Sequence, residues 1–206
     1  MSGIAVEVVK FESTEAFQAD SRKTVSPLLE LVGQTDGLIN SHFGSTIQEP
    51  KTAFVINVWE SLAKHDALVN DKPRFDEVLA RFKGSCASLN YLVHAHFNAE
   101  PFIALKAPVT EFAHWSLKEG ADKAVFEQKV DSLVKLAISW ADAAGCHGGG
   151  WGPVAENNRQ YFVLLGWNDL ELFTKAVQAS EQAMQLIGEL KELADLELLH
   201  TNLAKF

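Results

Sequence analysis

The fold of this chain is decided by residues 54–61, which read Phe-Val-Ile-Asn-Val-Trp-Glu-Ser. This stretch is an apolar run that ends in a tryptophan and is followed by a serine able to begin a helix. A stretch of the same design, Phe-Val-Leu-Leu-Gly-Trp-Asn-Asp, occupies residues 162–169 at an offset of 108 residues. Successive apolar positions are typical of a strand that is covered on both faces. We therefore expect a buried strand, followed by a helix, at two equivalent places.

The offset of 108 extends well beyond these two stretches. Glycines, aromatic residues and apolar positions coincide at it: Gly37 with Gly145, Gly44 with Gly152, Phe43 with Trp151, Phe54 with Phe162, Trp59 with Trp167, and Leu62 with Leu170. Such a set of coincidences indicates an internal duplication. The predicted domains are a first repeat at residues 1–98, a proline-containing linker at 99–108 and a second repeat at 109–206.

Hydrophobic periodicity and turn residues predict the same order of elements in both repeats. In the first repeat we expect strands at 4–11, 38–48, 52–59 and 89–97, with helices after the first and third strands. In the second we expect strands at 110–117, 146–156, 160–167 and 195–203, a helix at 121–144, and helices from Asp169 to Leu193. Ser13 is the expected cap of the first helix. Pro27 predicts a kink or break near Val25, because a proline inside a helix removes a backbone hydrogen bond.

The order β-α-β-β-α-β is the ferredoxin-like split unit. Its helices cover one face of a four-stranded antiparallel sheet, and the other face also needs cover. Two fused units can cover each other sheet to sheet. The predicted fold class is thus α+β, with two ferredoxin-like repeats forming an intrachain pseudo-dimeric α+β barrel.

Composition limits the choice of partners. The chain has 206 residues and a net charge of −9, with 47% hydrophobic and 22% charged residues. No basic run is present, which argues against nucleic acid or anionic lipid as a partner. The N-terminal residues lack the pattern of a signal peptide, no apolar run has the length of a membrane span, and two cysteines are too few for a disulfide scaffold. We expect a cytoplasmic protein that does not bind membranes, with a homodimer of the two-repeat chain as one option.

A family resemblance rests on motifs of the first repeat. The residues involved are Gly37, His42-Phe43-Gly44, Glu49-Pro50, the stretch at 54–61, His65, and Tyr91-Leu92-Val93-His94-Ala95-His96-Phe97. This pattern resembles the antibiotic-biosynthesis-monooxygenase (ABM) domain, and is most similar to fungal tandem members of the dimeric α+β barrel superfamily. The resemblance covers residues 1–98 well and 109–206 more weakly.

The resemblance implies a candidate site in the first repeat. In quinone-forming monooxygenases of that family, which need no cofactor, a tryptophan at the position of Trp59 and a tyrosine at the position of His65 line the substrate cavity. An asparagine contributes at the position that is Val55 here. Asn57 shares strand parity with Val55 and Trp59, so it can substitute for that asparagine. The alternative is that Trp59 is a core residue, which its repetition at Trp167 favours.

Histidines supply the remaining candidates. His42 is a polar residue in a strand expected to be buried, and it is either a cavity-lining general base or a structural histidine. His94 and His96 have the spacing that puts both on one strand face. His94 is predicted to contact the substrate, and no third ligand at a meaningful spacing supports a metal site. His114 is the one match to the strand histidine of plant polyketide cyclases.

Other known chemistries fit less well. The resemblance disfavours haem oxygenation, because the position of the required tryptophan is Leu68. The run His147-Gly148-Gly149-Gly150-Trp151-Gly152 looks like the oxyanion loop of some esterases, but the chain has no G-x-S-x-G motif to accompany it. These glycines indicate a bulge or room for close packing or a ligand.

Two functions remain open from the sequence. The first is a protein that binds a small apolar or aromatic, polyketide-like molecule and acts as a monooxygenase or cyclase of secondary metabolism without cofactor or metal. His65 and His42 are its predicted catalytic residues, and Trp59, Asn57, Val55 and His94 its predicted substrate contacts. Under this first function the second repeat is mainly a structural partner. The second function is that of a non-catalytic stress-response or ligand-carrier protein.

Overall fold

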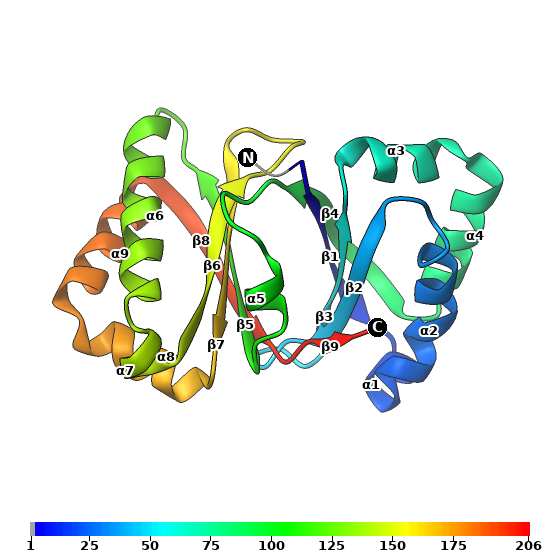
Figure 1. Cartoon of the computed structure of the whole chain (residues 1–206), viewed down its shortest axis with the longest axis horizontal. Helices are drawn as coiled ribbons and strands as arrows, with labels where there is room; N and C mark the ends of the chain where they lie inside the picture. The colour runs from blue at the N-terminus through cyan, green and yellow to red at the C-terminus, as the bar shows by residue number, and fades with distance from the viewer. Residues whose placement is uncertain (1–2) are drawn as a thin grey trace. The chain divides into compact units, whose positions relative to one another are not determined.

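A computed structural model describes residues 3–206, and the first two residues of the predicted first repeat lie outside it. The chain divides into two compact units, which are described one at a time. The first unit comprises Gly3–Ala95 with Leu203–Phe206, and the second comprises His96–Asn202. Figure 1 labels their helices and strands.

The first unit contains one antiparallel sheet with helices against it. Its elements are β1 (Ala5–Ser13), α1 (Glu15–Ala19), α2 (Ser21–Val32), β2 (Leu38–Ser45), β3 (Thr52–Trp59), α3 (Leu62–Asn70), α4 (Lys72–Phe82), β4 (Cys86–Ala95) and β9 (Ala204–Lys205). The strand order is β4-β1-β3-β2-β9. Helices and sheet enclose a core that includes Phe11, Phe17, Leu29, Val55 and Trp59. Apart from the short β9, this is the ferredoxin-like order of strands.

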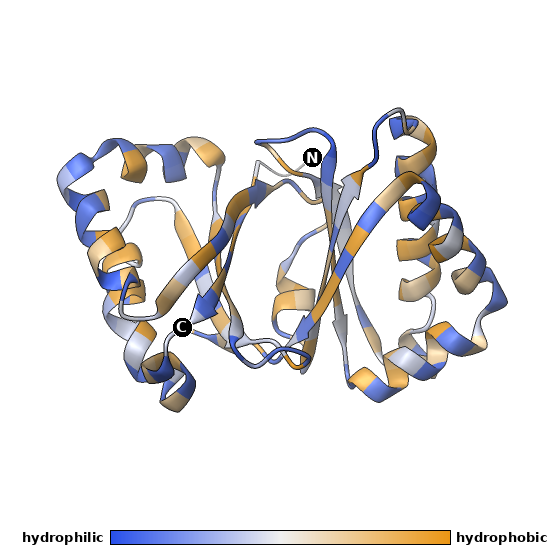
Figure 2. Cartoon of the chain, turned by 180° about the vertical axis from the view of Figure 1, so that it is seen from behind, coloured by the Kyte–Doolittle hydropathy of each residue, from blue (hydrophilic) through white to orange (hydrophobic). Residues whose placement is uncertain are grey.

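The second unit repeats the arrangement. Its elements are α5 (Phe102–Leu105), β5 (Val109–Leu117), α6 (Lys123–Ile138), α7 (Ala141–Ala144), β6 (Cys146–Pro153), β7 (Gln160–Trp167), α8 (Leu170–Ala179), α9 (Glu181–Leu193) and β8 (Ala194–Thr201). The order β6-β7-β5-β8 is equivalent to β2-β3-β1-β4 of the first unit. The predicted fold class, α+β with two ferredoxin-like repeats, is confirmed. Hydrophobic residues recur along the strands, and hydrophilic ones cover much of the outer side of the helices (Figure 2).

The start of the first helical segment differs from the prediction. Ser13 ends β1 and donates its hydroxyl to the carbonyl of Lys51, so it does not cap a helix. Thr14 is the cap, and its side chain accepts from the amide of Phe17. The break lies at Asp20, whose carboxylate accepts from Lys23 N and starts α2, whereas α2 runs on through Pro27. The break lies at Asp20 because its carboxylate can accept a hydrogen bond from a backbone N–H that would otherwise have no partner at the start of α2.

Two segments of the second unit carry structure that the sequence pattern does not reveal. The predicted helix at 121–144 is split at Ser139 and Trp140 into α6 and α7. Gly145 ends α7 with a φ of 66°, the left-handed conformation that suits glycine at a helix end. The predicted linker contains α5, which contacts β6 and β7.

The glycine-rich run at 147–152 lies in β6 and makes room for backbone. Residues His96 and Asn98 donate their amides to the carbonyls of Pro153 and Trp151, so this segment runs beside β6. A Cβ atom on Gly152 would lie 1.9 Å from the carbonyl oxygen of His96. The interpretation as close packing with a bulge fits, since the β6–β7 register shifts between Cys146 and Gly148.

Within residues 3–206, no helix combines the length and apolar character that crossing a bilayer requires.

Candidate functional site

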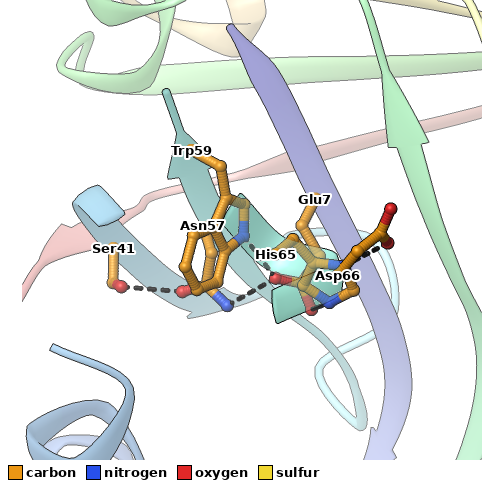
Figure 3. Close-up of polar contacts among 6 residues, drawn as sticks. All are labelled: Glu7, Ser41, Asn57, Trp59, His65 and Asp66. Carbon is orange, nitrogen blue, oxygen red and sulfur yellow. Dashed lines mark hydrogen bonds and ion pairs between the residues drawn. The ribbon is translucent and has the colours of Figure 1, made fainter. Parts of the chain in front are cut away.

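A buried carboxylate, Glu7 on β1, is the centre of the polar cluster in the first unit. Trp59 Nε1 donates to Glu7 Oε2 at 2.8 Å, and Asn57 Nδ2 donates to the same oxygen at 3.0 Å. Ser41 in turn donates its hydroxyl to Asn57 Oδ1 at 2.7 Å. Figure 3 shows this chain of contacts from Ser41 to Glu7. Two donors on one oxygen satisfy it and leave Glu7 Oε1 for other partners.

Strand register explains why these residues meet. Ser41 lies opposite Asn57, Asn57 opposite Glu7, and Glu7 opposite His94, so one row of side chains crosses β2, β3, β1 and β4. Residues directly opposite each other in antiparallel strands have neighbouring side chains on one face. Val55 and Trp59 belong to the core and share the parity of Asn57, so this row faces the helices.

His65, on α3, adds the second titratable group. Its Nε2 lies 3.9 Å from Glu7 Oε1, which is close enough for an ion pair but too long for a hydrogen bond. Its ring lies 5.5 Å from Trp59 and 4.3 Å from His94, centroid to centroid. His65 is 6% exposed and His94 is 3% exposed. A carboxylate and two imidazoles are thus gathered where little water reaches.

The second unit has a matching but less polar cluster. Trp167 Nε1 donates to Glu111 Oε2 at 2.8 Å, and His200 Nε2 lies 3.9 Å from the same oxygen. The row across its strands is Gly149, Leu165, Glu111 and His200. Phe173 stands where the first unit has His65, and its ring lies 4.8 Å from His200 and 5.0 Å from Trp167. The glutamate, tryptophan and strand histidine are therefore common to both units, whereas the helix histidine is specific to the first.

Burial shifts the protonation of the second cluster. It raises the pKa of Glu111 to about 7, against a smaller lowering by the hydrogen bond from Trp167. It also lowers the pKa of His200 to about 4. Both shifts have the sign expected when a charged form loses its hydration. Near neutral pH the imidazole of His200 is consequently neutral.

A cavity of about 60 Å³ borders the cluster of the first unit, between the sheet and α2, α3 and α4. Of the described residues on its wall, the polar ones are Glu7, Asn57 and His65. The apolar ones are Val9, Leu28, Val32, Val55, Leu68, Phe75, Val78, Leu79, Phe82 and Leu92. A cavity of the same volume lies at the equivalent place in the second unit, and Glu111 and several aromatic rings border it.

The structure brings most of the predicted site residues together. Asn57, Val55 and His65 line the cavity, and Trp59 and His94 contact its polar side chains. His42 is not among them. It lies opposite Ile56 with the reverse parity to Ser41, on the face of the sheet that points away from the helices. His114 lies in the second unit, stacked 4.5 Å from Phe162.

Sequence reasoning missed Glu7 and Ser41. The signal for Glu7 was a single acid inside the apolar strand at 5–9, with its counterpart Glu111 in the strand at 109–113. These two glutamates are 104 residues apart, and His94 and His200 are 106 apart, so a single offset of 108 does not align either pair. Loops of different length between the elements hide both equivalences.

The arrangement is suited to moving a proton. Oε1 of Glu7 lies 3.9 Å from Nε2 of His65, so the carboxyl group is placed beside any positive charge that the imidazole takes up. A molecule in the cavity would meet an imidazole backed by a carboxylate, surrounded by apolar walls. General bases in enzymes are commonly built in this way.

Comparisons of sequence provide no family for this chain. No family model matches it. No curated protein matches it either.

Comparisons of structure are informative about the fold. The chain is similar to an anthrone oxidase-like protein (TM-score 0.73, 12% identity, covering 99% of this chain and 92% of that one). It is also similar to a proposed monooxygenase of Fusobacterium nucleatum (TM-score 0.70, 9% identity, 98% and 93% covered). A third similar structure is a variant chlorite dismutase from Candidatus Nitrospira defluvii (TM-score 0.61, 11% identity, 99% and 92% covered).

These matches span both repeats, and at such identities they show the fold alone. The chain therefore shares its α+β fold with structures described as monooxygenase, anthrone oxidase-like and chlorite dismutase proteins.

Proposed function

We propose that the first unit binds a small apolar, aromatic molecule of the polyketide type and acts on it as a monooxygenase or cyclase that uses no cofactor. The observation that carries this proposal is the position of His65. It lines a largely apolar cavity, it faces the buried carboxylate of Glu7, and its equivalent in the second unit is Phe173. The imidazole of His65 has no equivalent in the second cavity, so it indicates a chemical function that is specific to the first unit.

The proposed first step is a proton transfer to His65 Nε2. An anthrone carries an acidic ring methylene in its keto form, and removal of one of its protons leaves a carbanion whose charge spreads over the aromatic system and the carbonyl group. Glu7 stabilises the imidazolium that forms. In an oxygenase reaction, molecular oxygen adds to the carbanion and takes up the proton to form a hydroperoxide. Loss of water from this hydroperoxide leaves a carbonyl group, so the methylene and oxygen become a ketone and water.

Binding requires the cavity to widen. A volume of about 60 Å³ holds a few water molecules, whereas sites for organic ligands measure roughly 300–1,000 Å³. Helix α4 is the element best suited to move, because none of its residues is buried. Leu79 on α4 and Leu92 on β4 line the cavity and are 44% and 37% exposed, so the entrance is inferred to lie between these two elements.

The proposal is tested by supplying anthrone and air and following the quinone by its absorbance. We expect turnover by the native chain and a loss of about 10²–10⁴-fold in the variant His65→Phe, the size usual for removal of a general base. This variant copies the residue that the second unit already accommodates, so it should fold. His147→Ala is the matched control, since His147 is exposed and bonded to Asn168. Equal turnover by the native chain and His65→Phe would contradict the proposal.

A non-catalytic carrier is the second candidate. The observation that favours it is the cavity of equal volume in the second unit, which has Phe173 in place of the histidine. If the cavities served only to bind a ligand, neither would need the catalytic histidine, and both could have the same function. Anthrone that quenches tryptophan fluorescence without any quinone formation would support the carrier and exclude the enzyme.

A further inference from the structure

A second property of the polar cluster involves His94, which the proton transfer does not use. Among residues 3–206, Glu7, His65 and His94 form a group of three metal-ligating side chains whose ligand atoms lie within 4.8 Å of one another. They come from β1, α3 and β4, and all three are buried. Two imidazoles and one carboxylate that converge from separate elements are a set of donors rather than an acidic surface patch.

We propose that Glu7, His65 and His94 bind one divalent ion of a first-row transition metal, with Zn²⁺, Fe²⁺ and Co²⁺ as the matching class. Imidazole nitrogen and carboxylate oxygen are the ligands that these ions take in proteins, whereas Mg²⁺ and Ca²⁺ prefer oxygen alone. Three protein ligands leave a position of the ion open. Glu7 and His65 line the cavity, so that open position faces it.

The distances need only a modest adjustment. Metal–ligand bonds of about 2.0–2.1 Å in tetrahedral geometry place neighbouring ligand atoms about 3.3 Å apart. The separation of His65 Nε2 and Glu7 Oε1 is 3.9 Å, and the largest separation in the group is under 4.8 Å. The side chains must therefore draw together by about 0.6 to 1.5 Å. Rotation of side chains on α3, whose buried residues are His65 and Leu68, is the expected source of this movement.

The contacts behind Glu7 suit a ligand. Trp59 and Asn57 both donate to Oε2, which fixes the carboxylate and leaves Oε1 on the side of His65. Ser41 holds the amide of Asn57 in the orientation that this requires. Hydrogen bonds to the second oxygen of a ligating carboxylate are a regular feature of metal sites, because they orient the ligand.

The second unit offers an internal comparison. It has Glu111, Trp167 and His200 in the same relation, but Phe173 replaces the helix histidine. Two ligands hold an ion far less tightly than three, so the second unit should bind none. Its cluster also predicts how to create a site, since Phe173→His would restore the third ligand.

Metal binding does not rest on the proposed function. The ion would occupy Nε2 of His65, so it excludes proton transfer to that atom, and the two uses belong to the metal-loaded and metal-free protein. Binding is therefore measured without substrate. Turnover of anthrone is then compared in the presence of a chelator and with the ion bound, so that failure of one proposal leaves the other open to its own test.

The experiment uses the untagged full-length chain, stripped with a chelator and titrated with Co²⁺ by calorimetry and by the visible absorption of the ion. We expect one Co²⁺ per chain, with the intense absorption of a four-coordinate site. His65→Phe and Glu7→Gln should each abolish it, His147→Ala should leave it unchanged, and Phe173→His should raise the stoichiometry from one to two.

Three results would overturn the proposal. The first is absence of Co²⁺ binding by the native chain. The second is retention of the spectrum in folded His65→Phe or Glu7→Gln, which would place the ion elsewhere. If both of those variants fail to fold, Phe173→His decides the matter, because a stoichiometry that stays at one contradicts the assigned set of ligands.

Discussion

The indole of Trp59 donates a 2.8 Å hydrogen bond to Oε2 of Glu7, and both side chains are buried. Trp167 makes the same bond, at the same length, to Glu111 in the second unit. In each unit the tryptophan thus packs in the core and satisfies a buried carboxylate that would otherwise be costly. The repeated tryptophan is primarily architectural. Opposite the carboxylate, the first unit has the titratable His65 where the second has Phe173.

The first prediction concerns Glu111, whose pKa burial raises to about 7. An acid that holds its proton more tightly when folded lowers the free energy of unfolding as the pH rises from about 4.5 to about 7. Gln at this position cannot ionise. Glu111→Gln should therefore gain stability relative to the native chain across that window, by roughly 2–4 kcal/mol once the carboxyl is fully ionised. Urea unfolding of both proteins at about pH 5 and about pH 8 measures the difference in their free energies of unfolding. A stability difference that is the same at both pH values would contradict the assignment.

The second prediction concerns His200, whose pKa burial lowers to about 4. A base that gives up its proton more readily when folded lowers the free energy of unfolding as the pH falls from about 6.5 to about 4. His200→Leu removes this loss, so its stability relative to the native chain should rise on acidification. The effects of Glu111 and His200 oppose each other where their windows overlap. The native chain should accordingly depend less on pH there than either variant, and parallel pH curves for all three proteins would show the prediction to be wrong.

The third prediction tests the chain of hydrogen bonds from Ser41 to Glu7. Asn57→Leu copies Leu165 of the second unit, and it removes the donor to Glu7 and the acceptor of Ser41. We expect a loss of roughly 1–3 kcal/mol, the penalty for buried polar groups without partners. Ser41→Ala should cost less. In the double variant the hydroxyl that lacks a partner is gone, so its loss should be smaller than the sum of the single losses. Denaturant midpoints of the four proteins give the coupling, and strict additivity would mean that the bond contributes nothing.

The fourth prediction concerns the entrance to the cavity. Helix α4 has no buried residue, whereas α2 buries five. Amide hydrogens of α4 should exchange with solvent faster than those of α2, because the apolar side chains of α4 are at most partly buried. Anthrone bound in the widened cavity should slow the exchange of α4. Mass spectrometry of peptides from both helices measures this, and equal protection without ligand would argue against α4 as the moving element.

Much of the fold can be predicted from the sequence, because the strands and helices follow from local patterns of residues. The boundaries Thr52–Trp59 and Gln160–Trp167 follow from apolar runs with turn residues on either side. Asp169 caps α8 with hydrogen bonds to the amides of Glu171 and Leu172, as its position before the helix predicts. Two predictions of element boundaries were wrong or incomplete. The break in the first helical segment was expected near Val25 because of Pro27, but it lies at Asp20, which caps α2. The strand β9 was not predicted, because two residues are too short to show a pattern.

The candidate site was predicted only in part, and the reason is again physical. Val55, Asn57 and Trp59 lie on one strand, so their common face follows from the two-residue period of a strand. His42 was grouped with them from its type and expected burial, and the register of β2 places it on the opposite face. The contribution of Glu7 depends on which residue it meets across β3 and β4, and no local pattern contains that information.

The sequence by itself determined the duplication, the order of the elements and the strand that bears the tryptophan, because each rests on residue spacing along a continuous segment. Only the tertiary structure decided that Ser41, Asn57, Glu7 and His94 form one row, and that α3 brings His65 to its end. The physical reason is that register between strands is set by pairing and packing. Loops of unequal length in the two repeats then displace equivalent residues along the chain without moving them in the fold.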